Sequence, residues 1–197
     1  MEITAAFNNR RSIYALSSQS SASDERVEEI LSDVLLAAPS AFNSQGTRLV
    51  LLLGENHKKL WHLVLEALRK VTPAGSFAAT EEKVASFAAA HGTILFFEDT
   101  QVTQALCDKF PLYKESFPVW ALESNGMLTY AVWVRLEAEG LGASLQHYNP
   151  LINEAVAKEW NLPAHWQLLG QMPFGVPTEA PGPKETQPVE TRLSVFK

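Results

Sequence analysis

The chain has 197 residues, of which 46% are hydrophobic and 19% charged, so it is long and apolar enough to bury a sizeable core. Its 16 Lys and Arg residues and 22 Asp and Glu residues leave a net charge of −6, which disfavours nucleic acid and anionic membrane as partners. A single cysteine, Cys107, excludes an intrachain disulfide and a cysteine-rich zinc site. The apolar runs are too short for a membrane span and the first residues lack a secretory-signal layout, so we expect a soluble, cytoplasmic protein.

The first quarter of the chain predicts two helices, a polar loop and a strand. Two apolar residues four positions apart predict a short helix over 2–9. Ser23 is a suitable N-cap for a second, amphipathic helix, which Pro39 ends. A polar loop over 39–46 then leads into an apolar strand over 48–53.

The middle of the chain combines helices with one buried strand. Apolar residues at helical spacing predict helices around 60–68 and 84–88. Residues 93–97 are apolar, β-branched or aromatic, which is typical of a strand buried on both faces. A long helix over 119–139 carries apolar residues all round, so we expect it to be covered on more than one side. Gly140 is a suitable left-handed cap for its end.

The last quarter predicts two more strands, a helix and a proline-rich tail. We expect a short strand over 143–147, a helix that opens at Asn149-Pro150, and a strand over 167–172. The tail after residue 173 ends in an alternating segment, 193–196, that has the pattern of an added edge strand. We find no repeat and no second core, so we expect one α+β domain over residues 1–197.

The sequence contains none of the common self-sufficient catalytic motifs. The five histidines are scattered without metal-ligand spacing, and we expect His57 and His62 at the surface. No nucleophile elbow, dinucleotide-binding glycine pattern or Walker loop is present. Cys107 lies in a helical context, and we interpret it as a buried small hydrophobe. The residues therefore single out no catalytic nucleophile, general acid or metal site.

Three polar segments are suited to holding a cofactor. Arg10, Arg11 and Ser12 offer two guanidinium forks and a hydroxyl, which suit a phosphate monoester, although a solvated turn has the same pattern. The amides of 43–45 match the mixed donor and acceptor edge of a heterocycle, or cap an ordinary loop. The backbone and side-chain hydrogen-bond donors of 143–147 are suited to contact a ligand, although an ordinary core strand has the same pattern.

Four segments together resemble the nitroreductase superfamily, and more narrowly its fatty-acid-repression-mutant-like branch. They are Asn-Arg-Arg-Ser-Ile-Tyr-Ala-Leu at 9–16, Pro-Ser-Ala-Phe-Asn-Ser-Gln at 39–45, Gly-Thr-Ile-Leu-Phe-Phe-Glu-Asp at 92–99 and Gly-Leu-Gly-Ala-Ser-Leu-Gln-His-Tyr-Asn-Pro at 140–150. The resemblance runs from about residue 5 to the end of the chain. It implies a nitroreductase-like mixed β-sheet flanked by helices, in a homodimer whose carboxyl-terminal tail reaches the partner.

The resemblance also implies an FMN-dependent oxidoreductase. Such an enzyme transfers electrons from NADH or NADPH to nitroaromatic or quinone-type acceptors by a ping-pong mechanism, and flavin chemistry explains the missing catalytic triad. Two alternatives stay open. One is a flavin-loaded regulatory protein in lipid or redox signalling with little turnover. The other is a flavin-fragmenting or dehalogenating enzyme, which needs a substrate lid that this chain has no long insertion to supply.

The resemblance assigns roles to individual residues. The cofactor contacts are Arg10, Arg11 and Ser12 at the FMN phosphate and ribityl chain, Tyr14 nearby, Asn43 and Gln45 at the isoalloxazine ring, and the backbone of Gln146 and His147 at its other side. The family brings basic residues back to the phosphate near the carboxyl end, for which Lys184 and Arg192 are the candidates, although 185–187 is less basic than in many relatives. Phe117 and Trp120 stack on aromatic substrates or are ordinary core aromatics.

Overall fold

The computed structural model describes residues 1–197, except for the side chain of Ala74. Over this range the sheet has four strands in the order β1-β2-β4-β3, and each neighbouring pair is antiparallel. The strands are β1 (Thr47–Leu53), β2 (Gly92–Asp99), β3 (Gly142–Ala143) and β4 (Trp166–Gly175). The helices are α1 (Ile3–Asn9), α2 (Asp24–Ala37), α3 (Gly54–Arg69), α4 (Phe77–Ala88), α5 (Thr100–Lys109), α6 (Phe117–Ala138) and α7 (Asn153–Glu159). Short 3-10 turns are η1 (Ala41–Asn43), η2 (Ala74–Ser76), η3 (Pro111–Tyr113) and η4 (Val189–Thr191).

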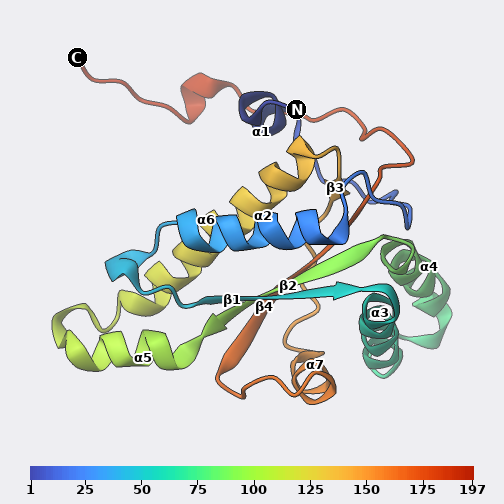
Figure 1. Cartoon of the computed structure of the whole chain (residues 1–197), viewed down its shortest axis with the longest axis horizontal. Coiled ribbons are helices and arrows are strands. Elements are labelled where there is room, and N and C mark those ends of the chain that lie inside the picture. Colours follow the sequence, from blue (N-terminus) through green and yellow to red (C-terminus); the bar gives the residue numbers. More distant parts are fainter.

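Strand β2 lies inside the sheet and separates two hydrophobic cores. Its side chains alternate, so that Ile94 and Phe96 join the core formed with α2 and α6, whereas Leu95 and Phe97 join the core formed with α3, α4 and α7. In Figure 1, α2 and α6 lie on one side of the sheet, α7 lies on the other, and α3 and α4 pack together at one end. Burial on both faces explains the continuous apolar run that predicted this strand.

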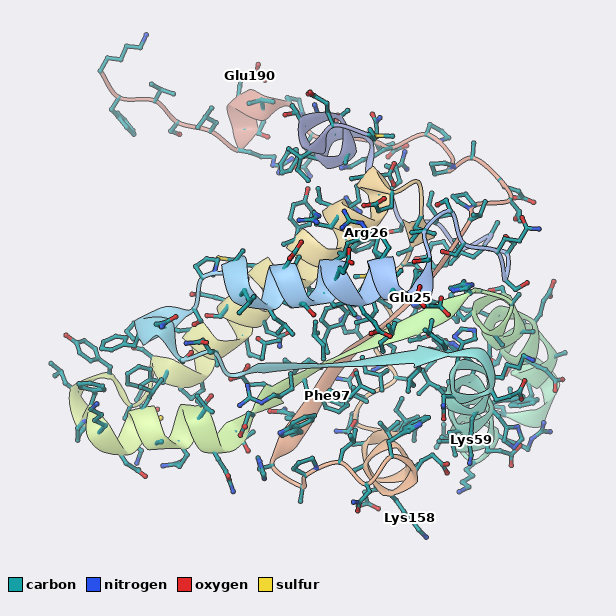
Figure 2. All side chains as sticks on the ribbon, viewed as in Figure 1. Glu25, Arg26, Lys59, Phe97, Lys158 and Glu190 are labelled. Atoms are coloured by element: carbon teal, nitrogen blue, oxygen red, sulfur yellow. The ribbon has the colours of Figure 1, made fainter. Side chains whose placement is uncertain are left out.

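One end each of α2 and α6, the helices on one side of the sheet, is capped as the sequence predicts. Ser23 Oγ accepts a hydrogen bond of 3.2 Å from the Arg26 N–H and caps α2, whose first turn lies at one end of the sheet in Figure 2. After α6, Gly140 adopts a φ of +80°, and the Leu141 N–H donates to the Leu136 carbonyl at 2.9 Å. Only a residue without Cβ adopts that φ without strain, so the glycine prediction is confirmed.

The sheet differs from expectation in two details, and one helix differs in where it begins. It was expected to be mixed, but parallel pairing among the described residues is confined to an isolated bridge between Ser12 and Ala143. The strand expected over 143–147 is only β3, because pairing beyond it is reduced to an isolated bridge from Gln146. The helix expected to open at 149–150 begins at Asn153 as α7, after a turn.

The proline-rich tail does not form the expected strand within this chain. Residues 193–196 have no regular structure and are exposed, because the alternating pattern supplies suitable side chains but not the backbone partner that a strand requires.

Among the described helices, none is long and apolar enough to cross a membrane.

His57 is buried at 2% exposure, which corrects the expectation that it lies at the surface. From α3 its Nδ1 lies 2.9 Å from Thr93 Oγ1 of β2, and its Nε2 lies 3.2 Å from the carbonyl oxygen of Ala88 at the end of α4. The Trp61 Nε1–H donates to the same Thr93 hydroxyl at 3.0 Å. Burial lowers the pKa of His57 to about 4, so the imidazole is neutral near pH 7.

Candidate functional site

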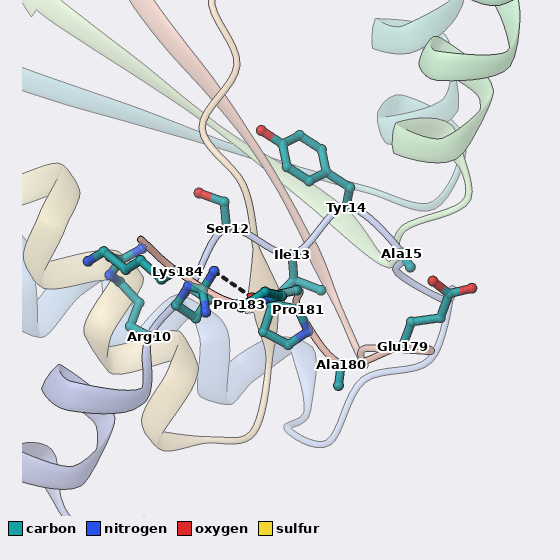
Figure 3. Close-up of a pocket in the computed structure, with 12 residues that line it drawn as sticks. Arg10, Ser12, Ile13, Tyr14, Ala15, Glu179, Ala180, Pro181, Pro183 and Lys184 are labelled. Atoms are coloured by element: carbon teal, nitrogen blue, oxygen red, sulfur yellow. Dashed lines mark hydrogen bonds between the residues drawn. The ribbon is translucent and has the colours of Figure 1, made fainter. Parts of the chain in front are cut away.

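A cavity of about 590 Å³ lies where the segment after α1 meets the tail that follows β4 (Figure 3). Its walls are residues 10–15 on one side and 179–184 on the other. Arg10, Arg11 and Lys184 bring three cationic side chains to it. In a protein of net charge −6, such a local concentration of positive charge is what attracts a phosphate group.

Both walls of the cavity are anchored by backbone hydrogen bonds. The Ile13 N–H donates to the Ala143 carbonyl at 2.9 Å, next to the bridge between Ser12 and Ala143. The Thr178 N–H donates to the Ala15 carbonyl, also at 2.9 Å, so the tail runs beside the same segment. The backbone that carries the two arginines is therefore tied to the end of the sheet.

The Arg10 side chain lies against two aromatic rings of α6. Its guanidinium carbon is 4.5 Å from the ring centre of Trp133 and 5.6 Å from that of Tyr130. Arg10 Nε is buried and has no hydrogen-bond partner among the described atoms. Burial raises the pKa of Glu137, and the nearby positive charge of Arg10 partly offsets this rise. A buried donor without an acceptor is costly, so this guanidinium is prepared for an anion.

The tail engages the second arginine. Arg11 Nη2 donates to the Gly182 carbonyl at 2.9 Å, which leaves its other N–H groups for a ligand. Lys184 lines the same cavity, whereas Arg192 lies beyond it, at the end of η4. Glu179 also lines the cavity and opposes the positive charge.

The remaining two residues predicted for this segment also line the cavity. Ser12 is exposed, and Tyr14 is 51% exposed with its ring centre 6.2 Å from that of Phe87. Both side chains are therefore accessible to a ligand. The structure brings together five of the predicted residues, namely Arg10, Arg11, Ser12, Tyr14 and Lys184.

A second cavity, of about 350 Å³, lies along α6. Tyr130 and Trp133 line it from the helix, and His147 and Gly170 line it from the sheet side. Because Arg10 lines the first cavity and lies over the rings of Tyr130 and Trp133, the two cavities are neighbours. A charged site next to an aromatic slot suits a ligand with a phosphate at one end and a flat ring at the other.

Of the predicted pair Gln146 and His147, only His147 lines this second cavity. The backbone N–H and C=O of Gln146 are both paired with Gln171, at 2.7 and 2.9 Å, and its Nε2 donates to Ser144 Oγ at 3.0 Å. Gln146 is buried at 8% exposure, so it holds the strand segment that presents His147.

The loop that carries Asn43 and Gln45 lies further along α6. The Ala41 N–H donates to Ser124 Oγ at 3.3 Å, nine residues before Trp133, which is about 14 Å along a helix. Gln45 borders a third cavity of about 340 Å³ there. Within one chain, the structure therefore does not bring Asn43 and Gln45 to the arginine pair.

Phe117 and Trp120 belong to an aromatic cluster between this loop and the start of α6. The cluster comprises Phe42, Phe110, Tyr113, Phe117 and Trp120. Phe117 is only 2% exposed, which favours its interpretation as a core aromatic. Trp120 is half-buried and stacks on Phe42 at 6.2 Å with an interplanar angle of 16°.

The sequence analysis missed Tyr130 and Trp133 as site residues. The signal was present, because two aromatic residues three positions apart share one face of a helix that was expected to be apolar all round. The left-handed φ of 55° at Phe42 was not predicted either, because residues with a Cβ rarely adopt it. The described residues contain no group of three His, Cys, Asp or Glu side chains that could hold a metal ion.

Comparison with known proteins finds relatives over most of the chain. The sequence pattern of the nitroreductase family matches residues 8–176. HBN1 of Saccharomyces cerevisiae is 37% identical over 177 residues, covering 89% of this chain and 88% of the relative. The nitroreductase FRM2 of the same yeast is 34% identical over 181 residues, covering 91% of this chain and 90% of the relative.

A solved structure gives the same result for the fold. Nitroreductase CinD from Lactococcus lactis, in complex with chloramphenicol, is 43% identical with a TM-score of 0.91, and each chain is covered to 100%. The same relative in complex with 4-nitrophenol gives 44% identity, a TM-score of 0.90 and the same coverage.

The chain belongs to the nitroreductase family, and its fold is the α+β fold of that family. The likeness to FRM2, whose name stands for fatty acid repression mutant, confirms the branch expected from the sequence. The chain is thus an oxidoreductase of the nitroreductase type.

Proposed function

We propose that this chain is an FMN-dependent oxidoreductase that uses NADH or NADPH to reduce small nitroaromatic or quinone-type acceptors. The observation that carries the proposal is the Arg10 guanidinium, whose Nε is buried without a partner between the charged cavity and the aromatic slot of α6. A phosphate supplies the acceptor that this donor lacks.

The residues present fit an FMN better than a dinucleotide. Arg10, Arg11 and Lys184 would hold the phosphate, and the hydroxyl of Ser12 would assist at the phosphate and ribityl chain. The chain has no glycine fingerprint for the pyrophosphate of FAD. The Glu179 carboxylate is the one unfavourable neighbour among the described lining residues, and it is exposed to solvent that screens its charge.

The aromatic slot suits the ring system of the cofactor. Tyr130 and Trp133 offer flat apolar faces. On the sheet side, Gly170 has no side chain to occupy the slot, and a Cβ there would lie 3.0 Å from Leu145 Cδ1, which also lines it. From this slot, α6 continues toward the loop of Asn43 and Gln45, whose amides we assign to the ring edge. When bound, FMN would supply two-electron transfer between nicotinamide and acceptor, and the residues above would bind and orient it.

The proposal includes a homodimer in which the tail reaches the partner. Exposed apolar side chains of α1 and α6, among them Phe7, Met127 and Tyr130, border a cavity of about 670 Å³ that a second copy would cover. The proposal also includes a cytoplasmic location, which cell fractionation tests. It further includes a single FMN-binding unit over residues 1–197, which limited proteolysis of the FMN-bound protein tests.

The decisive experiment is purification followed by cofactor analysis and turnover. We expect a yellow protein whose released cofactor has the mass of FMN, with NADH or NADPH oxidation that depends on 4-nitrophenol, chloramphenicol or a quinone. Parallel lines in double-reciprocal plots are expected for a ping-pong mechanism. FAD, or no flavin after reconstitution, overturns the cofactor assignment. Bound FMN with negligible turnover on every acceptor favours the regulatory alternative, and cleavage of the flavin favours the fragmenting one.

A further inference from the structure

The loop between α2 and β1 is held in an unfavourable backbone conformation. Phe42, Asn43 and Gln45 have φ values of 55°, 52° and 52°, in the left-handed region that residues with a Cβ rarely occupy. Such a conformation persists only where surrounding contacts impose it. The contacts that impose it on Gln45 therefore fix the backbone from which its amide side chain projects, and the amide Nε2 donates to the Asn43 carbonyl at 3.4 Å.

Two side chains supply these contacts: Ser40 Oγ accepts from the Gln45 N–H at 3.0 Å, and Arg48, at the start of β1, supplies the charged ones. Its Nη1 donates to the Gln45 carbonyl at 2.7 Å and to the Thr47 carbonyl at 3.1 Å. Its Nη2 donates to Asp99 Oδ2 at 2.9 Å. The planar guanidinium thus joins the loop to the end of β2 through hydrogen bonds in fixed directions, which a lysine cannot reproduce.

The Arg48–Asp99 pair is more buried than the other Arg–carboxylate pairs of the described structure. Its side chains are 31% and 9% exposed, compared with 53% and 54% for Arg69 and Glu81. Asp99 is fixed in turn, because its Oδ1 accepts from the Gln101 N–H at 3.1 Å and caps α5. A buried, multiply bonded pair keeps its geometry, whereas an exposed pair exchanges with water.

The backbone on the other side of Gln45 is fixed to the same strand end. The Asp99 N–H donates to the Gly46 carbonyl at 2.9 Å, and a Cβ on Gly46 would clash with the Glu98 carboxylate. Glu98 itself is 5% exposed and accepts from Thr103 Oγ1 at 3.2 Å. The loop therefore ends against a buried, hydrogen-bonded acidic strand end, and Arg48 is the cation that joins the loop to it.

We propose that Arg48, held by Asp99, is a positioning residue that fixes the Gln45 amide for contact with the cofactor ring. This inference rests on the proposed function, because Gln45 matters for turnover only if the flavin ring reaches it. Arg48 itself contacts neither cofactor nor substrate in this proposal. Its effect on the cofactor passes through the backbone carbonyl of Gln45.

The test compares Arg48→Gln, Arg48→Lys and Asp99→Asn with wild type, and uses Arg69→Gln as the matched control on a remote, exposed ion pair. Asn at position 99 retains the oxygen that caps α5, so this variant isolates the pairing charge. Three readouts are measured: hydrogen exchange of the cofactor-free loop over 40–46, FMN affinity by fluorescence titration, and the visible absorption and circular dichroism of bound FMN.

We expect faster exchange of the loop in all three variants, FMN binding weakened about tenfold in Arg48→Gln and less in Arg48→Lys, and an altered flavin spectrum. The control should match wild type in each readout. Wild-type loop exchange and wild-type flavin spectra in the variants overturn the positioning role. Failure of the wild-type protein to bind FMN instead overturns the proposed function, and the cofactor-free exchange data still report whether Arg48 holds the loop. If Arg48→Gln does not fold, Arg48→Lys and Asp99→Asn decide the matter alone.

Discussion

The guanidinium of Arg10 stacks on the indole ring of Trp133, with its carbon 4.5 Å from the ring centre, and still has a buried Nε without a partner among the described atoms. The ring limits the positions that the guanidinium can occupy, so little conformational freedom remains to be lost when a phosphate binds. Arg11 is held differently, by a single hydrogen bond to the tail carbonyl of Gly182. The two adjacent arginines therefore reach the same cavity with different degrees of preorganisation.

Removal of either arginine should weaken FMN binding without unfolding the protein. Charged hydrogen bonds contribute ~1.5–3 kcal/mol each, so Arg10→Ala and Arg11→Ala should lower FMN affinity by about one to two powers of ten. Excess FMN should restore turnover. Fluorescence titration measures the affinities, with Arg69→Ala as the control. Riboflavin, which lacks the phosphate, should bind wild type poorly and lose little more in the variants. Wild-type FMN affinity in both variants would mean that the doublet is only a solvated turn.

The two tail cations should behave differently. Lys184 lines the charged cavity and Arg192 does not, so Lys184→Ala should weaken FMN binding several-fold and Arg192→Ala should leave it unchanged. Deletion of all residues after Pro183 should weaken both FMN binding and dimerisation, which titration and light scattering measure. A loss of FMN affinity in Arg192→Ala equal to that in Lys184→Ala contradicts the assignment of the phosphate partner.

Buried His57 should make stability depend on pH in mildly acid solution. Its folded pKa is lowered to about 4, below the ordinary value near 6.5, so the unfolded chain binds more protons between these values. Stability is therefore complete above pH 6.5, falls as the pH drops toward 4, and loses about 3 kcal/mol over this window from this residue. Burial raises the pKa of Glu98, which contributes a slope of the opposite sign.

The contribution of His57 is isolated by comparison of variants in urea unfolding at a series of pH values. His57→Gln should flatten the dependence between pH 4 and 6.5, although it lowers stability at pH 7 by removing the bond to Thr93. His62→Gln, on the exposed face of the same helix, should leave the slope unchanged. An equal slope in wild type and His57→Gln is incompatible with a buried neutral imidazole.

Phe117 and Trp120 should separate into a structural and a substrate role. Phe117→Ala should lower the free energy of unfolding by about 3–5 kcal/mol, because a fully buried ring is removed. Trp120→Leu should raise KM for 4-nitrophenol with a smaller change in stability, since this ring is half-buried beside Phe42. Thermal unfolding and steady-state kinetics measure the two effects. An unchanged KM in Trp120→Leu removes it from the acceptor site.

Much of the fold was predictable where one local rule determined an element. The burial of β2 followed from its unbroken apolar run, and the ends of α2 and α6 followed from Ser23 and Gly140. The burial of His57 was not predictable, because it depends on Thr93, a residue that the fold brings from 36 positions away. Sequence spacing alone does not reveal such long-range partners.

The candidate site likewise has features that the sequence predicts and features that only the fold creates. Arg10, Arg11 and Ser12 are adjacent in sequence, so their proximity needed no fold. The pairing of Arg10 with Trp133, and the place of Lys184 in the same cavity as Arg10, arise only when α6 and the tail pack on the same segment. Asn43 and Gln45 stand apart from them because their loop packs near Ser124 on α6, a long-range contact that no motif records, although the length of the helix itself was predicted.

The central position of β4 affects the order in which the chain can fold. Asp99 pairs with Trp166 and Gly92 with Phe174, sequence separations of 67 and 82 residues, whereas Leu53 and Gly92 in the β1–β2 pair are 39 apart. Closing the longer loops costs more chain entropy, so hairpin-like pairing of β1 with β2 should precede the entry of β4. Both cores include β4 side chains, Leu168 in one and Met172 and Phe174 in the other, so neither core is complete on a ribosome until that part of β4 has been synthesised. Until then, one edge of the apolar strand β2 remains open to chaperones or to other nascent chains.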